Sequence, residues 1–237
     1  VWYYASDKLL TITDSTGTGV IKRVDTSLSA AERNQVTEFG VIVCLGGTAK
    51  FQLFGGTLNA QDQVTTGGGA IAGTTADNVI DIYGGTVKGA SGQYGGGIFA
   101  KGPVNLYGGT VTGGEATNGG NIYVDGSFQM YGGTVTSGSA TGKGKDILVA
   151  ANAAGYLLGG NLTGEAVVAA NAKCYLGETA FAQNGDSAAL HIEGTLCVCD
   201  GWSGSATVSF PTEYASGANI PAELAQVVQL KNDLTEE

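Results

Sequence analysis

The chain of 237 residues is poor in charge, proline, methionine and histidine. Charged side chains make up 14% of it, and it holds 3 prolines, 1 methionine and 1 histidine. Low charge together with a hydrophobic content of 43% excludes a disordered, charge-solvated chain. The scarcity of proline excludes a proline-rich stalk, and no run approaches the roughly 20 apolar residues of a membrane helix. We therefore expect a chain that buries a core and is not inserted in a membrane.

Basic residues are outnumbered by acidic ones. The chain has 11 Lys and Arg against 21 Asp and Glu, for a net charge of −10, and its arginines are Arg23 and Arg33. Nucleic acids are bound by clustered Lys and Arg, so no nucleic-acid partner is expected. The chain opens at Val1 without a basic and apolar leader. We expect a segment of an extracellular or cell-surface protein whose export signal is not part of this chain.

Cysteine is also rare. Its 4 copies are Cys44, Cys174, Cys197 and Cys199, too few for a disulfide scaffold. Zinc needs four ligands, and the lone histidine is His191. The expectation is buried thiols or one local disulfide, with bridges from Cys174 to Cys197 or Cys199 both open. No metal and no cofactor are expected.

Glycine is the residue in excess, with 41 copies and no collagen-like triplet period. A motif of the form apolar, polar, apolar, aromatic, Gly, Gly, Thr recurs every 24 to 29 residues. Its copies begin at Phe51, Ile80, Val104 and Phe128, with a weaker copy at Gly155. Glycine-led apolar motifs follow at Gly68, Gly96, Gly119 and Gly144, and residues 172–200 lose the double glycine.

The alternation predicts short strands with one buried face, and the paired glycines predict sharp bends. Short strands and bends in about 24 residues fit one coil of a parallel β-helix; a propeller blade needs roughly 40. We predict an all-β solenoid of about six coils spanning residues 40–200. Residues 1–39 are predicted to form an N-terminal cap with a short helix opening at the capping box Ser29 to Glu32, and residues 201–237 a C-terminal cap or the start of another segment. The predicted turn glycines are Gly55, Gly56, Gly84, Gly85, Gly108, Gly109, Gly132, Gly133, Gly159 and Gly160.

The Gly-Gly-Thr-Val-x-Gly-Gly pattern, followed by Gly-Gly-Asn-Ile-Tyr-Val at 119–124, resembles the glycine-rich right-handed β-helix repeats of bacterial surface and secreted proteins. The resemblance covers about residues 40–170 well and 171–200 loosely. It implies a right-handed, single-stranded stack on a bacterial surface. The same pectate-lyase-like superfold includes lyases, polygalacturonases, phage tailspikes and adhesins, so the fold does not decide the activity.

Catalysis is not expected from the acidic residues. Glycoside hydrolases need two carboxylates facing each other, whereas Asp81 aligns with the amides Gln52, Asn105 and Gln129. Calcium-binding repeats would place a carboxylate in every unit, and the corresponding places hold Ala70, Ile98 and Ile122. We therefore assign no catalytic residue and no metal ligand.

Stacked coils align like residues in columns. Phe54, Tyr83, Tyr107 and Tyr131 form one column and Thr57, Thr86, Thr110 and Thr134 another. Such ladders stabilise a solenoid. If they are exposed, the candidate binding residues are Tyr83, Tyr107, Tyr131, Thr86, Thr110 and Thr134.

The expected function is a non-enzymatic, rigid structural or adhesive module of a bacterial surface protein, self-associating end to end, with a glycan or a protein surface as partner. The alternative is a carbohydrate-binding or polysaccharide-cleaving β-helix. A minor alternative is an ice-binding β-helix, because the pairs Thr110/Thr112 and Thr134/Thr136 resemble ice-binding faces; Lys88 interrupts that regularity.

Overall fold

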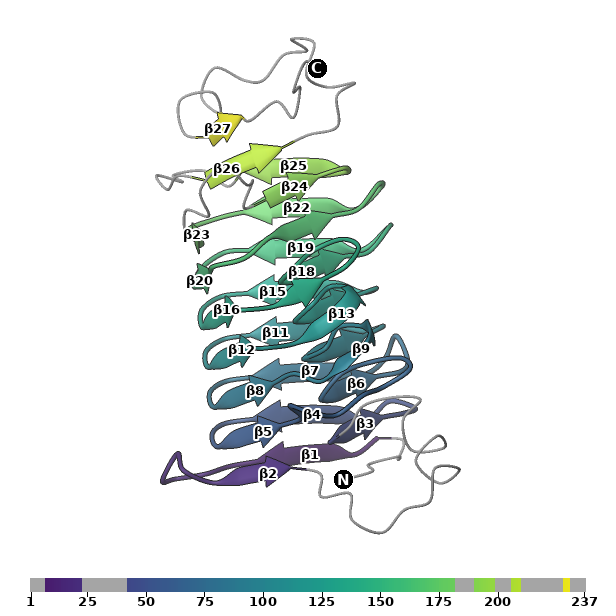
Figure 1. Cartoon of the computed structure of the whole chain (residues 1–237), viewed down its shortest axis with the longest axis vertical. Coiled ribbons are helices and arrows are strands. Elements are labelled where there is room, and N and C mark those ends of the chain that lie inside the picture. Colours follow the sequence, from purple (N-terminus) through teal and green to yellow (C-terminus); the bar gives the residue numbers. More distant parts are fainter. Residues whose placement is uncertain (1–6, 23–41, 182–189, 199–205, 210–227, 231–237) are drawn as a thin grey trace.

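The computed structural model describes residues 7–22, 42–181, 190–198, 206–209 and 228–230. The described part is all β, without a helix, and its strands form four sheets of parallel strands. Successive segments contribute one strand to each of three long sheets in turn, so the strands rise as rungs along one axis (Figure 1). This is consistent with a parallel β-helix. The predicted helix at Ser29 to Glu32 lies outside the described residues.

Sheet 1 carries the first repeat motif and has eight strands. In spatial order they are β1 (Leu9–Ile12), β4 (Lys50–Leu53), β7 (Val79–Ile82), β11 (Val104–Leu106), β15 (Ser127–Met130), β19 (Ala154–Leu157), β22 (Lys173–Leu176) and β25 (Thr195–Val198).

Sheet 2 follows the double-glycine bend and has seven strands. They are β2 (Val20–Lys22), β5 (Thr57–Asn59), β8 (Thr86–Lys88), β12 (Thr110–Thr112), β16 (Thr134–Thr136), β20 (Asn161–Leu162) and β23 (Ala180–Phe181). β1 and β2 lie within the predicted N-terminal cap and are terminal strands of sheets 1 and 2.

Sheet 3 carries the second motif and has nine strands. They are β3 (Val43–Leu45), β6 (Ile71–Gly73), β10 (Ile98–Ala100), β14 (Ile122–Val124), β18 (Ile147–Val149), β21 (Ala166–Val168), β24 (Leu190–Ile192), β26 (Ala206–Ser209) and β27 (Val228–Leu230).

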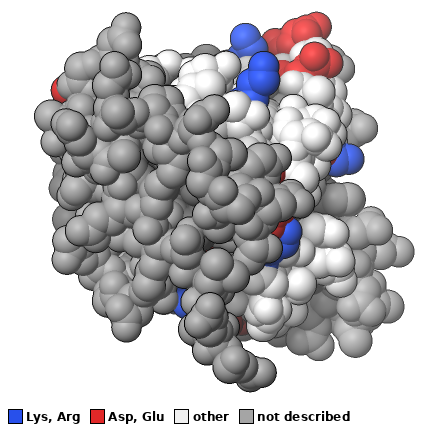
Figure 2. Space-filling view, turned by 90° about the horizontal axis from the view of Figure 1, so that it is seen from above, with Lys and Arg blue, Asp and Glu red and all other residues white. Residues whose placement is uncertain are grey.

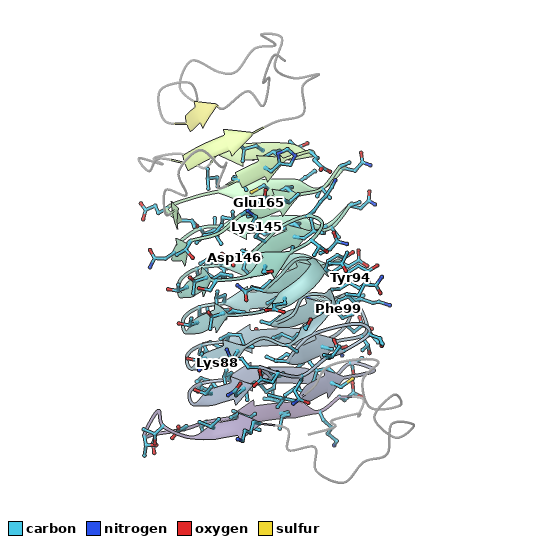
Figure 3. All side chains as sticks on the ribbon, in the orientation of Figure 1. Lys88, Tyr94, Phe99, Lys145, Asp146 and Glu165 are labelled. Carbon is cyan, nitrogen blue, oxygen red and sulfur yellow. The ribbon has the colours of Figure 1, made fainter. Side chains whose placement is uncertain are left out.

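A short fourth sheet was not expected from the sequence. It consists of β9 (Ser91–Tyr94), β13 (Glu115–Asn118) and β17 (Ser139–Ala140). Tyr94 of β9 connects it to sheet 3, because its ring centroid lies 6.1 Å from that of Phe99 (Figure 3). The Tyr94 centroid also lies 4.8 Å from that of Tyr123. β9 and β13 consist mainly of small and polar residues and lack the apolar alternation that marks a half-buried strand.

The register of sheet 1 confirms the aligned copies of the first motif. Phe51 pairs with Ile80, Ile80 with Val104, Val104 with Phe128, and Phe128 with Gly155. The inward side chains of these strands form continuous apolar columns in one core. Apolar contacts between consecutive rungs therefore stabilise every level of the stack.

The register of sheet 3 corrects one alignment. Ile98 pairs with Ile71, not with Ala70, and continues to Ile122 and Ile147. Ala70 therefore belongs with Gly97, Asn121 and Asp146, one residue earlier. Aligning the copies on their glycines rather than on the buried isoleucine column caused the error.

Candidate functional site: the outer face of sheet 1

An exposed column of stacked rings runs beside sheet 1. Phe54, Tyr83, Tyr107 and Tyr131 each follow a strand of this sheet and are 39–47% exposed. Consecutive ring centroids lie 4.6, 4.8 and 5.1 Å apart, with interplanar angles of 4–6°. The spacing matches the roughly 4.8 Å between hydrogen-bonded strands, so the rings repeat the rungs of the backbone.

This stacking decides which part of each ring a partner can reach. Tyr83 and Tyr107 have both ring faces covered by neighbours in the column, since the rings are almost parallel at van der Waals spacing. The exposed parts are therefore ring edges and phenol hydroxyls. A sugar ring that stacks on an aromatic face therefore finds no free face at Tyr83 or Tyr107. The column offers a row of hydroxyls rather than a flat platform.

A polar column lies next to the rings, two residues earlier in each strand. Asp81 is its centre: its carboxylate accepts hydrogen bonds from Gln52 Nε2 at 3.4 Å and from Asn105 Nδ2 at 2.8 Å. One rung further, the Tyr131 hydroxyl donates to Gln129 Oε1 at 2.6 Å. On the next two rungs, Tyr156 and Tyr175 take the places that Gln129 and the other polar residues hold in this polar column, and their ring centroids lie 4.7 Å apart. The outer face of sheet 1 thus pairs amides and one carboxylate with aromatic edges.

The electrostatics of this face act on its central tyrosine. Desolvation is the main factor raising the pKa of Tyr107, and the negative charge of Asp81 raises it further, followed by the neighbouring Tyr83 and Tyr131. Tyr107 therefore keeps its hydroxyl proton at neutral pH and can donate a hydrogen bond to an acceptor on a partner.

The glycine pairs behind the rings set the position of the column. An added Cβ at Gly108 would lie 2.6 Å from the carbonyl oxygen of Tyr83, and one at Gly132 would lie 2.5 Å from that of Tyr107. The second glycine of each pair has a positive φ, for example +80° at both Gly109 and Gly133. Left-handed backbone favours glycine. The remaining predicted turn glycines, Gly55, Gly56, Gly84, Gly85, Gly159 and Gly160, repeat this arrangement.

The threonine columns lie on the neighbouring sheet 2. Thr86, Thr110 and Thr134 are in register on three consecutive rungs and are half-buried. Thr112 and Thr136 form the second column, which has Lys88 on the rung before them. The tyrosine and threonine candidates thus face outward on adjacent sheets and do not converge on one pocket.

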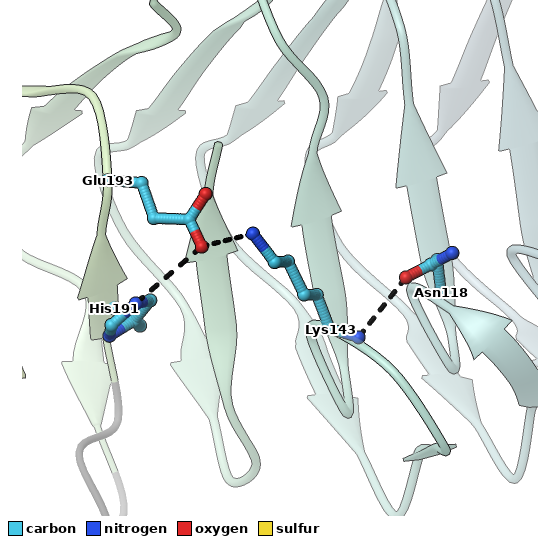
Figure 4. A network of polar contacts seen from close by, with 4 residues as sticks. All are labelled: Asn118, Lys143, His191 and Glu193. Carbon is cyan, nitrogen blue, oxygen red and sulfur yellow. Dashed lines mark hydrogen bonds and ion pairs between the residues drawn. The ribbon is translucent and has the colours of Figure 1, made fainter. Parts of the chain in front are cut away.

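The lone histidine lies on the outside of sheet 3. His191 Nε2 is 3.8 Å from Glu193 Oε1, and the same carboxylate oxygen bonds to Lys143 Nζ (Figure 4). The backbone N–H of Lys143 donates to Asn118 Oδ1 at 3.2 Å. This network ties rungs that are far apart in sequence. Across the described ranges, no three His, Cys, Asp or Glu side chains gather as a metal site would require.

One of the two open disulfides is excluded. Cys174 is buried in the core, whereas Cys197 pairs with Tyr175 on the outer side of sheet 1, and no bridge joins the two. Alternation along the strand puts the thiols on opposite faces. The pairing with Cys199 lies outside the described residues.

A buried polar pair was missed by the sequence reasoning. Asn121 and Asp146 are both 0% exposed and occupy equivalent places one residue before β14 and β18. Asn121 Oδ1 accepts from the N–H of Gly114 at 2.8 Å, and Asp146 Oδ1 accepts from that of Gly138 at 2.7 Å. Each side chain therefore holds the turn that leads from sheet 2 into sheet 4. The sequence feature that points to this pair is the column of isoleucines, because Asn121 and Asp146 directly precede Ile122 and Ile147.

The comparisons with known proteins add no assignment. No protein family, curated protein or solved structure matches this chain. Within the described residues, no helix has the length and apolarity to cross a membrane.

Proposed function

We propose that the chain is a non-enzymatic, rigid structural and adhesive module of an extracellular bacterial surface protein. In finer detail, the proposed architecture is a right-handed, single-stranded parallel β-helix of about six coils between residues 40 and 200. The observation that carries the proposal is the exposed, in-register column of aromatic rings beside hydrogen-bonded amides on sheet 1. The bacterial surface is supported by the resemblance of the repeat.

Rigidity is supported by the core. Residues such as Phe51, Ile80 and Phe128 are completely buried and contact the levels above and below. Backbone groups between strands are paired along the stack, including at the bends, where the N–H of Thr110 donates to Gly85 O at 2.9 Å. Seen along the stack, the visible described residues are mostly uncharged (Figure 2). Such a stack resists unfolding and proteolysis, as a spacer requires.

Adhesion is supported by the chemistry of the sheet 1 face. Tyrosine edges give apolar contact area, and their hydroxyls, with Gln52, Asp81 and Gln129, can exchange hydrogen bonds with a glycan or a protein surface. The neighbours of Asp81 in its column are amides, so this face lacks a second carboxylate beside Asp81 for glycoside hydrolysis. Binding without cleavage is therefore the favoured role, and polysaccharide cleavage is the alternative.

End-to-end self-association is the third part of the proposal. Among the described residues, β1 and β2 are the terminal strands of their sheets, and Leu9 and Val20 on them are 54% and 58% exposed. Exposed terminal strands can pair with another chain. Sedimentation of Leu9→Lys/Val20→Lys against the wild type tests this part: we expect concentration-dependent assembly of the wild type alone. Monomeric wild type at all concentrations would remove it.

The test of adhesion uses a glycan array and a protein array, probed with the wild type and with the Tyr83→Phe/Tyr107→Phe/Tyr131→Phe variant. The variant keeps the rings and loses the hydroxyls, so we expect an intact fold with weaker adhesion. Thr112→Val on sheet 2 is the control and should adhere like the wild type. Release of reducing ends from any polysaccharide would overturn the non-enzymatic assignment, and unchanged adhesion of the triple variant would overturn the role of the column.

A further inference from the structure

A cavity of about 220 Å³ lies where the fourth sheet begins. The segment from Thr57 to Ile71 is two residues longer than the equivalent one from Thr86 to Ile98. Its extra length forms a turn at Asp62, which has a φ of +66°. The chain then returns at Val64, which makes an isolated parallel bridge to Ser91 of β9. The turn stands away from the rungs beside it, and the space between them is the cavity.

Polar side chains surround this cavity above a floor of small residues. Asp62 and Glu115 supply carboxylates, and Gln61 and Gln63 supply primary amides. Gly89 and Ala90 are buried and also line the cavity; because their side chains are so small, they leave its space unfilled. Val64, whose side chain is 70% exposed, adds one apolar contact at the rim.

The charge of the lining selects the ligand. Among the residues that the structure describes, no Lys or Arg lines the cavity, while two carboxylates do. Carboxylates accept hydrogen bonds from hydroxyl and ammonium groups and repel anions. Within the described ranges, Asp62 and Glu115 have no third His, Cys, Asp or Glu side chain beside them. Two carboxylates alone are a poor set of protein ligands for a metal ion.

The size restricts the ligand further. Cavities for drug-sized ligands run from about 300 to 1,000 Å³, so a volume of about 220 Å³ fits a single small ring. A sugar ring combines the required features, since it has several hydroxyl groups for the amides and carboxylates and an apolar C–H face for Val64. We propose that this cavity binds one pyranose ring that is neutral or carries an amino group.

The test is ligand-observed NMR and calorimetry on the whole chain with glucosamine, glucose, glucuronate and ethanolamine. We expect binding of glucosamine and glucose, with glucosamine the tighter, and none of glucuronate. Binding of ethanolamine as tight as that of glucosamine would show an amine site and overturn the proposal. Equal binding of glucuronate, or no sugar binding at millimolar concentrations, would also overturn it.

Variants place the binding in the cavity. Glu115→Ala and Asp62→Asn should weaken glucosamine binding by about tenfold or more, the loss expected for a charged hydrogen-bond partner. Asparagine tolerates the positive φ at Asp62, so this variant keeps the turn. Glu178→Ala, an exposed carboxylate elsewhere, is the matched control and should bind like the wild type. If the cavity variants bind like the wild type, the site is wrong, whereas the adhesive face on sheet 1 is tested by different residues.

Discussion

The side-chain amide of Asn121 donates a hydrogen bond of 2.7 Å to the buried carboxylate of Asp146, the residue at the equivalent place one rung further along the stack. Asn121 Nδ2 also donates to the carbonyl oxygen of Thr136 at 2.8 Å. The second oxygen of Asp146, Oδ2, is buried without a hydrogen-bond partner. The backbone N–H of Asp146 donates to the carbonyl oxygen of Glu165 on the next rung, and that of Lys145 donates to the Glu165 carboxylate (Figure 3). A carboxylate in this position makes the stack sensitive to pH.

Asp146→Asn should stabilise the protein at neutral pH. Burial raises the pKa of Asp146, and polar contacts with the backbone N–H groups of Gly138 and Gly164 and with the amide of Asn121 act against that shift. The native state therefore retains a proton that the unfolded chain loses above its ordinary pKa of 3.8. Stability falls as pH rises through the raised pKa. We expect a gain in stability at pH 7 and none at pH 3, measured by urea unfolding.

The control for this variant is Asp77→Asn, which removes an exposed carboxylate and should leave the pH profile unchanged. The contrary result would be a variant that is less stable than the wild type at pH 7 but equally stable at pH 3. That result would mean that the buried carboxylate is ionised and stabilised by its hydrogen bonds.

Gly132→Val should destabilise the stack by at least about 2 kcal/mol. The new Cβ would lie 2.5 Å from the carbonyl oxygen of Tyr107, and backbone on the adjacent rung cannot move away without breaking its own hydrogen bonds. Gly17→Asn is the control, because a Cβ there meets nothing within 4 Å and asparagine tolerates its φ of +71°. Thermal melts of both variants measure the difference, and equal melting temperatures would contradict the register of the bends.

Tyr107→Ala should cost more stability than Tyr107→Phe. Alanine removes two stacked contacts, to Tyr83 and Tyr131, each worth about 0.5–1.5 kcal/mol. Phenylalanine keeps both rings in contact and should stay within about 0.5 kcal/mol of the wild type. Chemical denaturation gives both values. Equal losses in the two variants would mean that the hydroxyl, rather than the stacking, stabilises the column.

Cys197 should react with a maleimide in the native protein, whereas Cys44 and Cys174 should not. Cys197 is half-buried on the outer side of sheet 1, and the other two are buried. Burial also raises the pKa of the Cys44 thiol, which keeps it in the unreactive protonated form. Peptide mapping by mass spectrometry before and after urea unfolding identifies the labelled residues. Native labelling of Cys174 would show that the core opens at that rung.

Much of the fold followed from local pattern. Alternation in the first motif placed Phe51, Ile80, Val104 and Phe128 in one buried column, because a strand with one face in a core needs apolar residues at every second position. The fourth sheet did not follow, since its strands are held by backbone pairing between rungs and carry no apolar period. The Asn121–Asp146 pair escaped for a related reason, because the bonds from Asn121 to Asp146 and to Thr136 join neighbouring rungs.

The sequence by itself determined the repeat, the strands of the first motif and the place of the bends, since strand alternation and the freedom of glycine are local properties of the chain. Tertiary structure alone decided that the Tyr107 ring is exposed at its edge while both faces are covered, and that the turn at Asp62 leaves a cavity beside Glu115. Exposure and cavities depend on which rungs lie next to each other and how far a loop stands from them. Those distances arise only when residues far apart in the chain are packed together.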